Sequence, residues 1–237
     1  MNEDAAAQAL LGEVAAEWRS GGPLDELSAL VRQVWRTNLV RYEPSRLGDD
    51  AMSLGVQSSR NLGNLAVRRL SGTVGVQASN LRTLEVRYRG RVLHAGKVTS
   101  RSSSWDITSV DWSQSEVRTT SAEMNSRAYV SAAGTLFEDA ELLAEQPADP
   151  RMLCQLQVMW QGFDDGSTRT WVGFPQLGTS PWFAVMLLDD DRGGSGGLPA
   201  ADAVPVPPTP DFDALGEPVL KLTRRSARKS HPQQREA

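Results

Sequence analysis

The hydrophobic positions between Met152 and Leu188 predict three consecutive β-strands. In residues 152–161 the apolar residues fall on every second position, which is the period of a pleated strand with one buried face. Residues 168–174 are rich in Thr, Trp, Val and Phe, and residues 182–188 form an unbroken apolar run. Turn-forming segments rich in Gly, Asp and Pro separate the three, so we expect an antiparallel meander. The face of the first strand that should be buried consists of Met152, Cys154, Leu156, Val158 and Trp160.

This meander holds three of the seven tryptophans of the chain, Trp160, Trp171 and Trp182. An aromatic side chain can bury roughly 150–250 Å² of surface, so we expect most of the core energy here. An antiparallel sheet must bury its apolar face against a second layer, and the helices upstream are the candidates for it.

Helical spacing of apolar residues marks four upstream segments, at residues 5–18, 24–40, 50–70 and 114–129. Gly55 and Gly63 each cost a helix about 1 kcal/mol relative to alanine, so residues 52–57 can instead form a loop or a short strand. Ser113 and Glu116 have the spacing of a capping box at the start of the fourth helix. A further helix is possible at 135–145.

Leu84, Val86 and Tyr88 alternate with charged residues and predict a half-exposed strand. Gly90 supplies a turn, and residues 91–98 return as the partner strand. The charged face and short connection of this hairpin place it at an edge of the sheet. Together these elements predict an α+β fold, with an antiparallel sheet of about five strands and helices packed on one face.

A sharp change of composition follows Leu188. Residues 193–210 are rich in Gly and Pro, and the last residues, 221–237, are rich in Arg. Such a segment cannot bury enough apolar surface to offset its ordering entropy. We therefore expect a single α+β domain at 1–190, followed by a Gly/Pro-rich linker and a basic disordered tail at 191–237.

Composition and charge exclude several classes of protein. The formal net charge of −4 is mild and gives little support to a nucleic-acid partner. Cys154 is the only cysteine, so neither an intrachain disulfide nor a cysteine metal site is expected. No P-loop or Gly-x-Gly-x-x-Gly pattern suggests a nucleotide cofactor, and no apolar run approaches the roughly 20 residues of a membrane span. We expect a soluble, cytoplasmic protein with no cofactor, no bound metal and no membrane contact.

Histidine is nearly absent, with His94 on the hairpin and His231 near the C-terminus. A Ser-His-Asp hydrolase would have to use His94, and no Gly-x-Ser-x-Gly elbow accompanies it. We expect His94 to be an exposed strand residue.

Arginines are concentrated around the hairpin, where Arg87, Arg89 and Arg91 follow at every second position. If they project together they form a basic patch that can bind an acidic protein partner or a nucleic-acid backbone. The alternative is a charged edge that prevents pairing with other strands.

A second candidate surface is the loop that carries Trp105, Asp106, Asp111 and Trp112. Aromatic residues beside acids on a loop often line binding sites. The alternative is that the tryptophans pack at the start of the following helix and the acids cap turns.

A weak catalytic candidate is the set Asp50, Glu85 and Arg87, with Asp49 as a substitute for Asp50. Metal-dependent nucleases of the restriction type hold Mg²⁺ with an Asp and a Glu-x-Lys on adjacent strands. Here arginine replaces lysine, and the Asp precedes a helix. The alternative is an ion pair on a solvated strand face.

Three hypotheses of function follow, and they leave open whether the protein is an enzyme. The first is a non-catalytic binding or regulatory module that acts through the arginine-rich hairpin and the Trp/Asp loop. The second is a metal-dependent nuclease or phosphodiesterase. The third is an accessory subunit of a larger assembly that docks through the first two helices.

Overall fold

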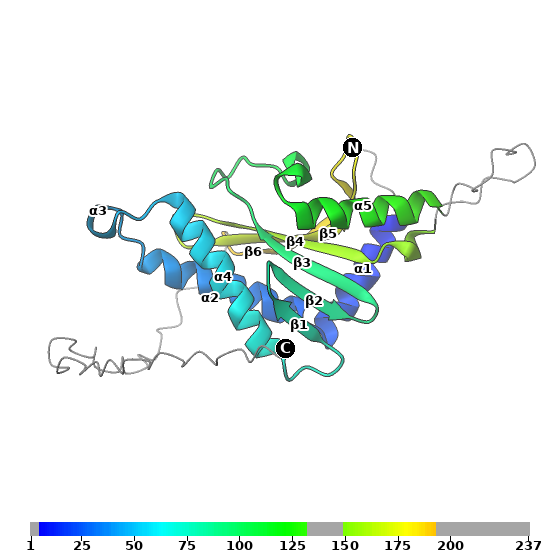
Figure 1. Ribbon diagram of the computed structural model, residues 1–237, viewed down its shortest axis with the longest axis horizontal. Coiled ribbons are helices and arrows are strands. Elements are labelled where there is room, and N and C mark those ends of the chain that lie inside the picture. The colour runs from blue at the N-terminus through cyan, green and yellow to red at the C-terminus, as the bar shows by residue number, and fades with distance from the viewer. Residues whose placement is uncertain (1–4, 132–148, 193–237) are drawn as a thin grey trace, which may run out of the picture. The chain divides into compact units, whose positions relative to one another are not determined.

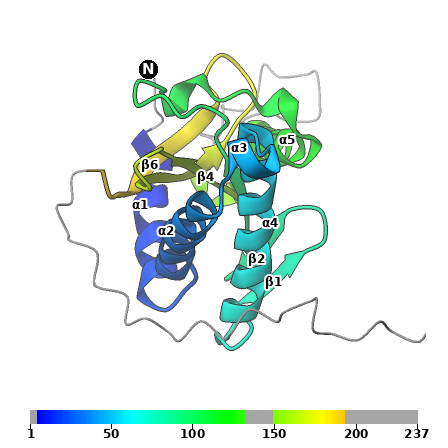
Figure 2. The same ribbon diagram turned by 90° about the vertical axis from the view of Figure 1, so that its left-hand side faces the viewer.

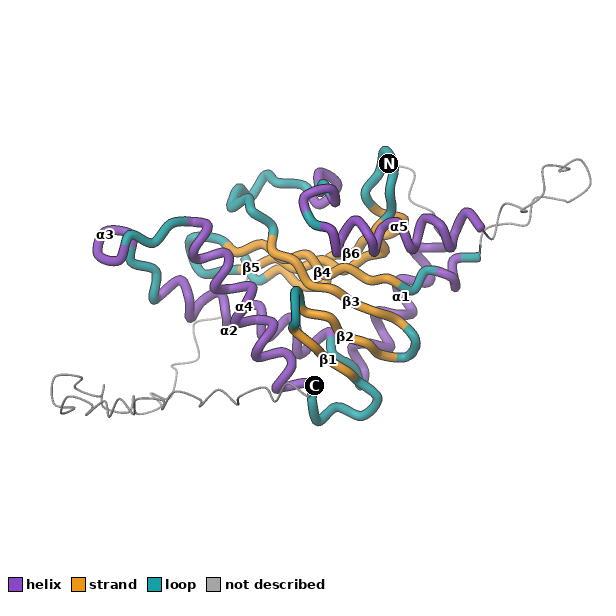
Figure 3. The backbone as a smooth tube through the Cα atoms, viewed as in Figure 1, coloured by secondary structure: helices purple, strands orange, loops and turns teal. Residues whose placement is uncertain are grey.

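The computed structural model describes residues 5–131 and 149–192, and it confirms the α+β class. A six-stranded sheet with the spatial order β1-β2-β3-β4-β5-β6 forms its centre (Figures 1 and 3). The strands are β1 (Gln77–Asn80), β2 (Leu84–Tyr88), β3 (Arg91–Lys97), β4 (Gln155–Gly162), β5 (Thr168–Pro175) and β6 (Trp182–Asp190).

The meander predicted after Met152 is confirmed, because β4, β5 and β6 pair antiparallel in sequence order. The hairpin of β2 and β3 is also confirmed. Two details differ from the prediction. The short polar strand β1 extends the sheet, and β3 pairs with β4 in parallel, with Val92 opposite Gln155. A parallel pair requires a crossover connection, and the helix between these two strands provides it.

The helices are α1 (Ala5–Ser20), α2 (Leu24–Val40), α3 (Pro44–Leu47), α4 (Ala51–Leu70) and α5 (Glu116–Ser131), with short 3-10 turns η1 (Ile107–Ser109), η2 (Trp112–Gln114) and η3 (Pro150–Met152). Helix α4 runs without a break through Gly55 and Gly63, so the loop alternative is wrong. Asp50 caps it by accepting a bond from the backbone of Ser53. Gly63 has a packing role, because a Cβ there would lie 2.4 Å from the Asn80 side chain of β1.

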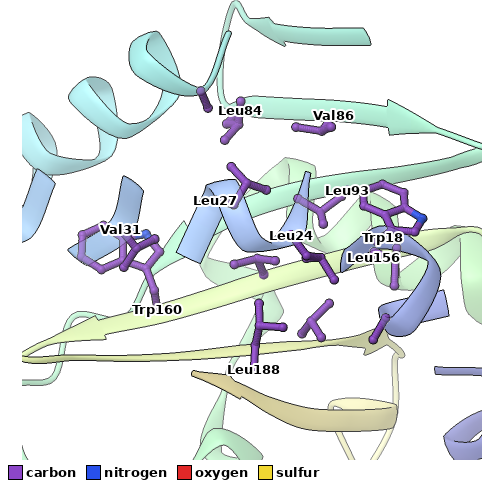
Figure 4. Packing of buried hydrophobic residues seen from close by; sticks show 14 of the residues in the cluster. Trp18, Leu24, Leu27, Val31, Leu84, Val86, Leu93, Leu156, Trp160 and Leu188 are labelled. Atoms are coloured by element: carbon purple, nitrogen blue, oxygen red, sulfur yellow. The ribbon is translucent and has the colours of Figure 1, made fainter. Parts of the chain in front are cut away.

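Helices α1, α2 and α4 cover one face of the sheet and enclose the main core (Figure 2). Side chains from α1, α2 and the strands converge there, among them Trp18, Leu27 and Leu156 (Figure 4). The indoles of Trp35 and Trp160 meet edge to face with ring centroids 6.1 Å apart. The apolar stripes of the first two helices are therefore used within the chain itself.

The opposite face is covered as well, by α5 and the loop before it (Figure 1). A second cluster there contains Trp112, Met159, Trp171 and Trp182. The expectation that helices pack on one face is thus incomplete, since the polar face of β4 is buried beneath this second layer. Met152, expected in the core, is 51% exposed because it lies in η3, before β4 begins.

Two further details concern the ends of predicted segments. Helix α5 begins at Glu116, and Ser113 lies in η2, so the predicted capping box is wrong. Asp191, just after the predicted end of the domain at residue 190, forms an ion pair with Arg36 at 2.8 Å. The possible helix at 135–145 and the tail at 193–237 lie outside the described residues. None of the helices described is both long and apolar enough to cross a membrane.

Candidate functional site

In the described part of the chain, a groove of about 450 Å³ lies between the β1–β3 edge of the sheet and α5. It exists because α5 lies over β4 and β5, which leaves the outer strands uncovered on that face. A volume of this size lies in the range of roughly 300–1,000 Å³ typical of ligand sites. The groove is lined by Ser79, Leu81, Arg82, Thr83, Glu85, His94, Glu116, Val117, Thr120, Ser121, Met124 and Gln155.

His94 is a buried residue of the groove lining, which corrects the expectation that it is exposed. It lies directly opposite Glu85 on the neighbouring strand, so both side chains share the α5 side of the sheet. Burial lowers the pKa of His94, and the negative charge of Glu85 opposes this shift. The imidazole is therefore neutral at pH 7. Its buried Nδ1 has no hydrogen-bond partner among the described residues.

Asn125 holds α5 in the position that forms the groove wall. Its side chain is fully buried and donates to the carbonyl oxygens of Gln155 at 2.9 Å and Pro175 at 3.1 Å. Its Oδ1 accepts from the backbone N–H of Gln155 at 3.0 Å. One side chain thus joins the helix to the start of β4 and the end of β5.

We expect Asn125→Ala to lower the free energy of unfolding by about 2 kcal/mol, because it leaves buried backbone groups of Gln155 and Pro175 without partners. Urea denaturation monitored by circular dichroism measures the change. Asn64→Ala is the control, since Asn64 bonds Asn80 at an exposed site. Equal, small effects of both substitutions would contradict this role of Asn125.

The rims of the groove combine exposed apolar and charged side chains. Leu81 is 96% exposed on one rim, and Met124 of α5 is 48% exposed on the other. Arg82 and Glu116 carry opposite charges on these same two rims, and neither forms an ion pair within residues 5–131 and 149–192. The groove therefore offers an apolar contact and a charged contact on each side.

The three hairpin arginines do not come together. Arg87 pairs with Glu85 at 2.6 Å on the α5 side. Arg89 donates to the Tyr88 hydroxyl and to Glu17 of α1 at 2.8 Å, and these two contacts raise its pKa. Arg91 lies opposite Tyr88 and is partly buried. The guanidinium groups therefore point in different directions, and only Arg87 lies on the groove side of the hairpin.

The tryptophans of the Trp/Asp loop pack inward. Trp112 is buried, its ring meets Trp182 at 4.7 Å, and its Nε1 donates to the Pro181 carbonyl. Trp105 is partly buried against Trp171, with ring centroids 5.5 Å apart. These contacts anchor the loop to β5 and β6.

The acids of that loop cap its turns. Asp106 accepts from the backbone of Thr108, and Asp111 accepts from the backbone of Ser113, both at 2.9 Å. Hydrogen bonds from Ser113 hold the pKa of Asp111 below its ordinary value.

The residues of the nuclease hypothesis lie apart. Asp50 caps the start of α4, and Gly63, thirteen positions further along the chain, lies against Asn80 of β1. At a rise of 1.5 Å per residue this places Asp50 about 20 Å along the helix from β1. Glu85 lines the groove on the opposite face of the sheet. Within the described residues there is no group of three His, Cys, Asp or Glu side chains that could hold a metal ion.

Reasoning from sequence missed His94, Asn125 and the α5 wall as parts of one site. The signal available was a polar set on β4, Gln155, Gln157 and Gln161, which are buried under α5 and the preceding loop. Comparison of the chain with models of known protein families, with curated proteins and with solved structures finds no match.

Proposed function

We propose that this protein is a non-catalytic binding module that takes a short extended segment of a partner protein into the groove between the hairpin edge and α5. The observation that carries the proposal is the groove itself, with buried His94 in its lining and exposed Leu81 and Met124 on its two rims. In this proposal the binding surface is the groove, and not the arginine-rich hairpin or the Trp/Asp loop.

The character of the groove favours a peptide. Exposed apolar rims next to a polar floor suit an extended chain, whose side chains alternate while its backbone hydrogen-bonds. Ser79 of the edge strand β1 and the hydroxyls of Thr120 and Ser121 supply polar partners along the groove. Arg82 favours an acidic side chain in the ligand, and Glu116 favours a basic one.

Peptide display provides a direct test without knowledge of the natural partner. Random twelve-residue peptides would be selected on the wild-type full chain, and the enriched sequences measured by fluorescence anisotropy. We expect enrichment of peptides with an apolar residue flanked by an acidic one. Thr120→Trp, which places an indole in the groove from an exposed position of α5, should weaken their binding by about tenfold or more.

Arg127→Trp is the matched control, because Arg127 is exposed on the same helix but does not line the groove. It should leave peptide affinity unchanged. Arg82→Glu should weaken acidic peptides and spare neutral ones. Failure to enrich any peptide, or equal binding to wild type and Thr120→Trp, would contradict the proposed site.

A further inference from the structure

Arg118 is a partly buried guanidinium that forms no ion pair or hydrogen bond within the described residues. It lies in the first turns of α5 on the side away from the groove, against strand β3. Its contact there is unusually close, since a Cβ on Gly96 would come within 2.4 Å of Nη2 of Arg118. The glycine therefore provides the space in which the guanidinium rests on the strand.

This placement has an electrostatic cost. Burial lowers the pKa of Arg118, but arginine stays protonated in proteins, so the side chain cannot relieve the cost by losing its proton. The charge of Arg118 is only partly withdrawn from water, and that part of the cost remains unless an opposite charge or hydrogen-bond acceptors compensate it. The described residues that surround it supply no carboxylate within ion-pair distance.

A small cavity of about 110 Å³ adjoins the guanidinium, beneath the loop that leads from β3 to α5. Thr99 and Gln114 bring a hydroxyl and an amide to its wall, and Trp105 and Met159 make the remainder apolar. Asp111 also borders it, but its carboxylate is engaged by Ser113 and Gln114. Lys97 also lines this cavity, but its amino group lies near two indole rings, 5.0 Å from the centroid of Trp35 and 5.6 Å from that of Trp160.

We propose that this cavity is a binding site for a small oxyanion group, phosphate or carboxylate, held by the guanidinium of Arg118. Arginine presents a planar fork of donors that matches either group in a bidentate arrangement. Thr99 lines the same cavity and can donate its hydroxyl, and the Gln114 amide, which directs one N–H to Asp111 at 3.5 Å, has a second N–H to donate. The negative charge of Asp111 at the border favours a singly charged group over a doubly charged one. The site is separate from the groove and does not depend on the function proposed for it.

Thermal unfolding of the full chain in phosphate, acetate or chloride at matched ionic strength tests the proposal. Oxyanion salts also stabilise proteins because they are excluded from the protein surface. Only the part of the rise in Tm that is lost when Arg118 is replaced therefore reports binding at this site. For wild type we expect a Tm in about 50 mM phosphate or acetate roughly 3 °C above that in chloride. Arg118→Met should reduce this difference to the part that general exclusion supplies, and Arg127→Met on the same helix should retain it in full.

Gly96→Ala provides a second variant that leaves all charges in place. Its new methyl group displaces only the flexible end of Arg118, so the fold should persist while the oxyanion response falls by at least half. If Arg118→Met does not fold, the proposal is tested by the Tm response of Gly96→Ala alone. A response confined to phosphate or to acetate identifies which group the site takes. An equal response of wild type, Arg118→Met and Gly96→Ala would overturn the proposal.

Discussion

Replacement of Gly162 by alanine should lower the free energy of unfolding by about 3 kcal/mol, the upper end of the range for overpacking a core. A Cβ at this position would lie 2.3 Å from Cδ2 and Cε2 of Trp35, far inside contact distance. Trp35 cannot move aside, because its ring is fully buried, packs against Trp160 and donates from Nε1 to the Phe163 carbonyl at 2.8 Å.

Gly55→Ala is the matched control for this prediction. A Cβ on Gly55 of α4 meets nothing within 4 Å, so alanine there should stabilise the helix by up to about 1 kcal/mol. Urea denaturation of the three proteins measures both effects. The two substitutions are chemically identical, and their opposite signs would isolate the close approach of β4 to Trp35. A Gly162→Ala protein as stable as wild type would show that the core can yield at this point.

The second large effect is a pH dependence that arises from Lys97. Burial lowers the pKa of Lys97 from 10.5 to about 8, and the positive charge of Arg101 adds to the shift. The folded pKa is below the unfolded one, so between these values the unfolded chain binds more protons and stability rises with pH. Over the window from pH 8 to 10.5 this group alone should add about 3 kcal/mol.

Lys97→Met keeps the length of the side chain and should abolish this rise. We would measure the free energy of unfolding of both proteins at pH 7 and pH 10 and compare the two changes, which cancels the titration of tyrosines. The faces of Trp35 and Trp160 lie near the ammonium group and favour its charged form. If that attraction outweighs burial, the two proteins will show parallel pH curves and the prediction will fail.

Patterns of apolar and polar residues over short segments predicted most of the helices and strands. The alternation in residues 152–161 and the apolar run at 182–188 correspond to β4 and β6, and the stripe at 24–40 corresponds to α2. These succeed because the side-chain period is set by the strand or helix itself, which is a local property. The same pattern did not reveal that both faces of β4 are buried. The same logic missed β1, since its four residues, Gln77–Asn80, are polar and have no apolar face.

Local sequence patterns did not predict which residues form the candidate site. Asp50, Glu85 and Arg87 were grouped because their residue types suit a metal site, yet α4 and the groove lie on opposite faces of the sheet. Arg87, Arg89 and Arg91 could form a patch only if they projected together, but Arg87 and Arg89 pair with different acids, and Arg89 lies in the turn with a φ of 46°. Proximity between segments depends on strand order and crossover, and neither is encoded in a local pattern.

The order of residues along this chain is sufficient to establish an α+β architecture, the meander after Met152 and the hairpin at 84–97, because each of these depends on contacts between neighbours in sequence. Only the folded arrangement decided that β3 and β4 run parallel, that α5 covers the second face, and that His94 is buried and Arg118 partly buried. Burial of a polar residue is a property of what packs over it, and here the covering helix lies more than twenty residues away from the strand it covers.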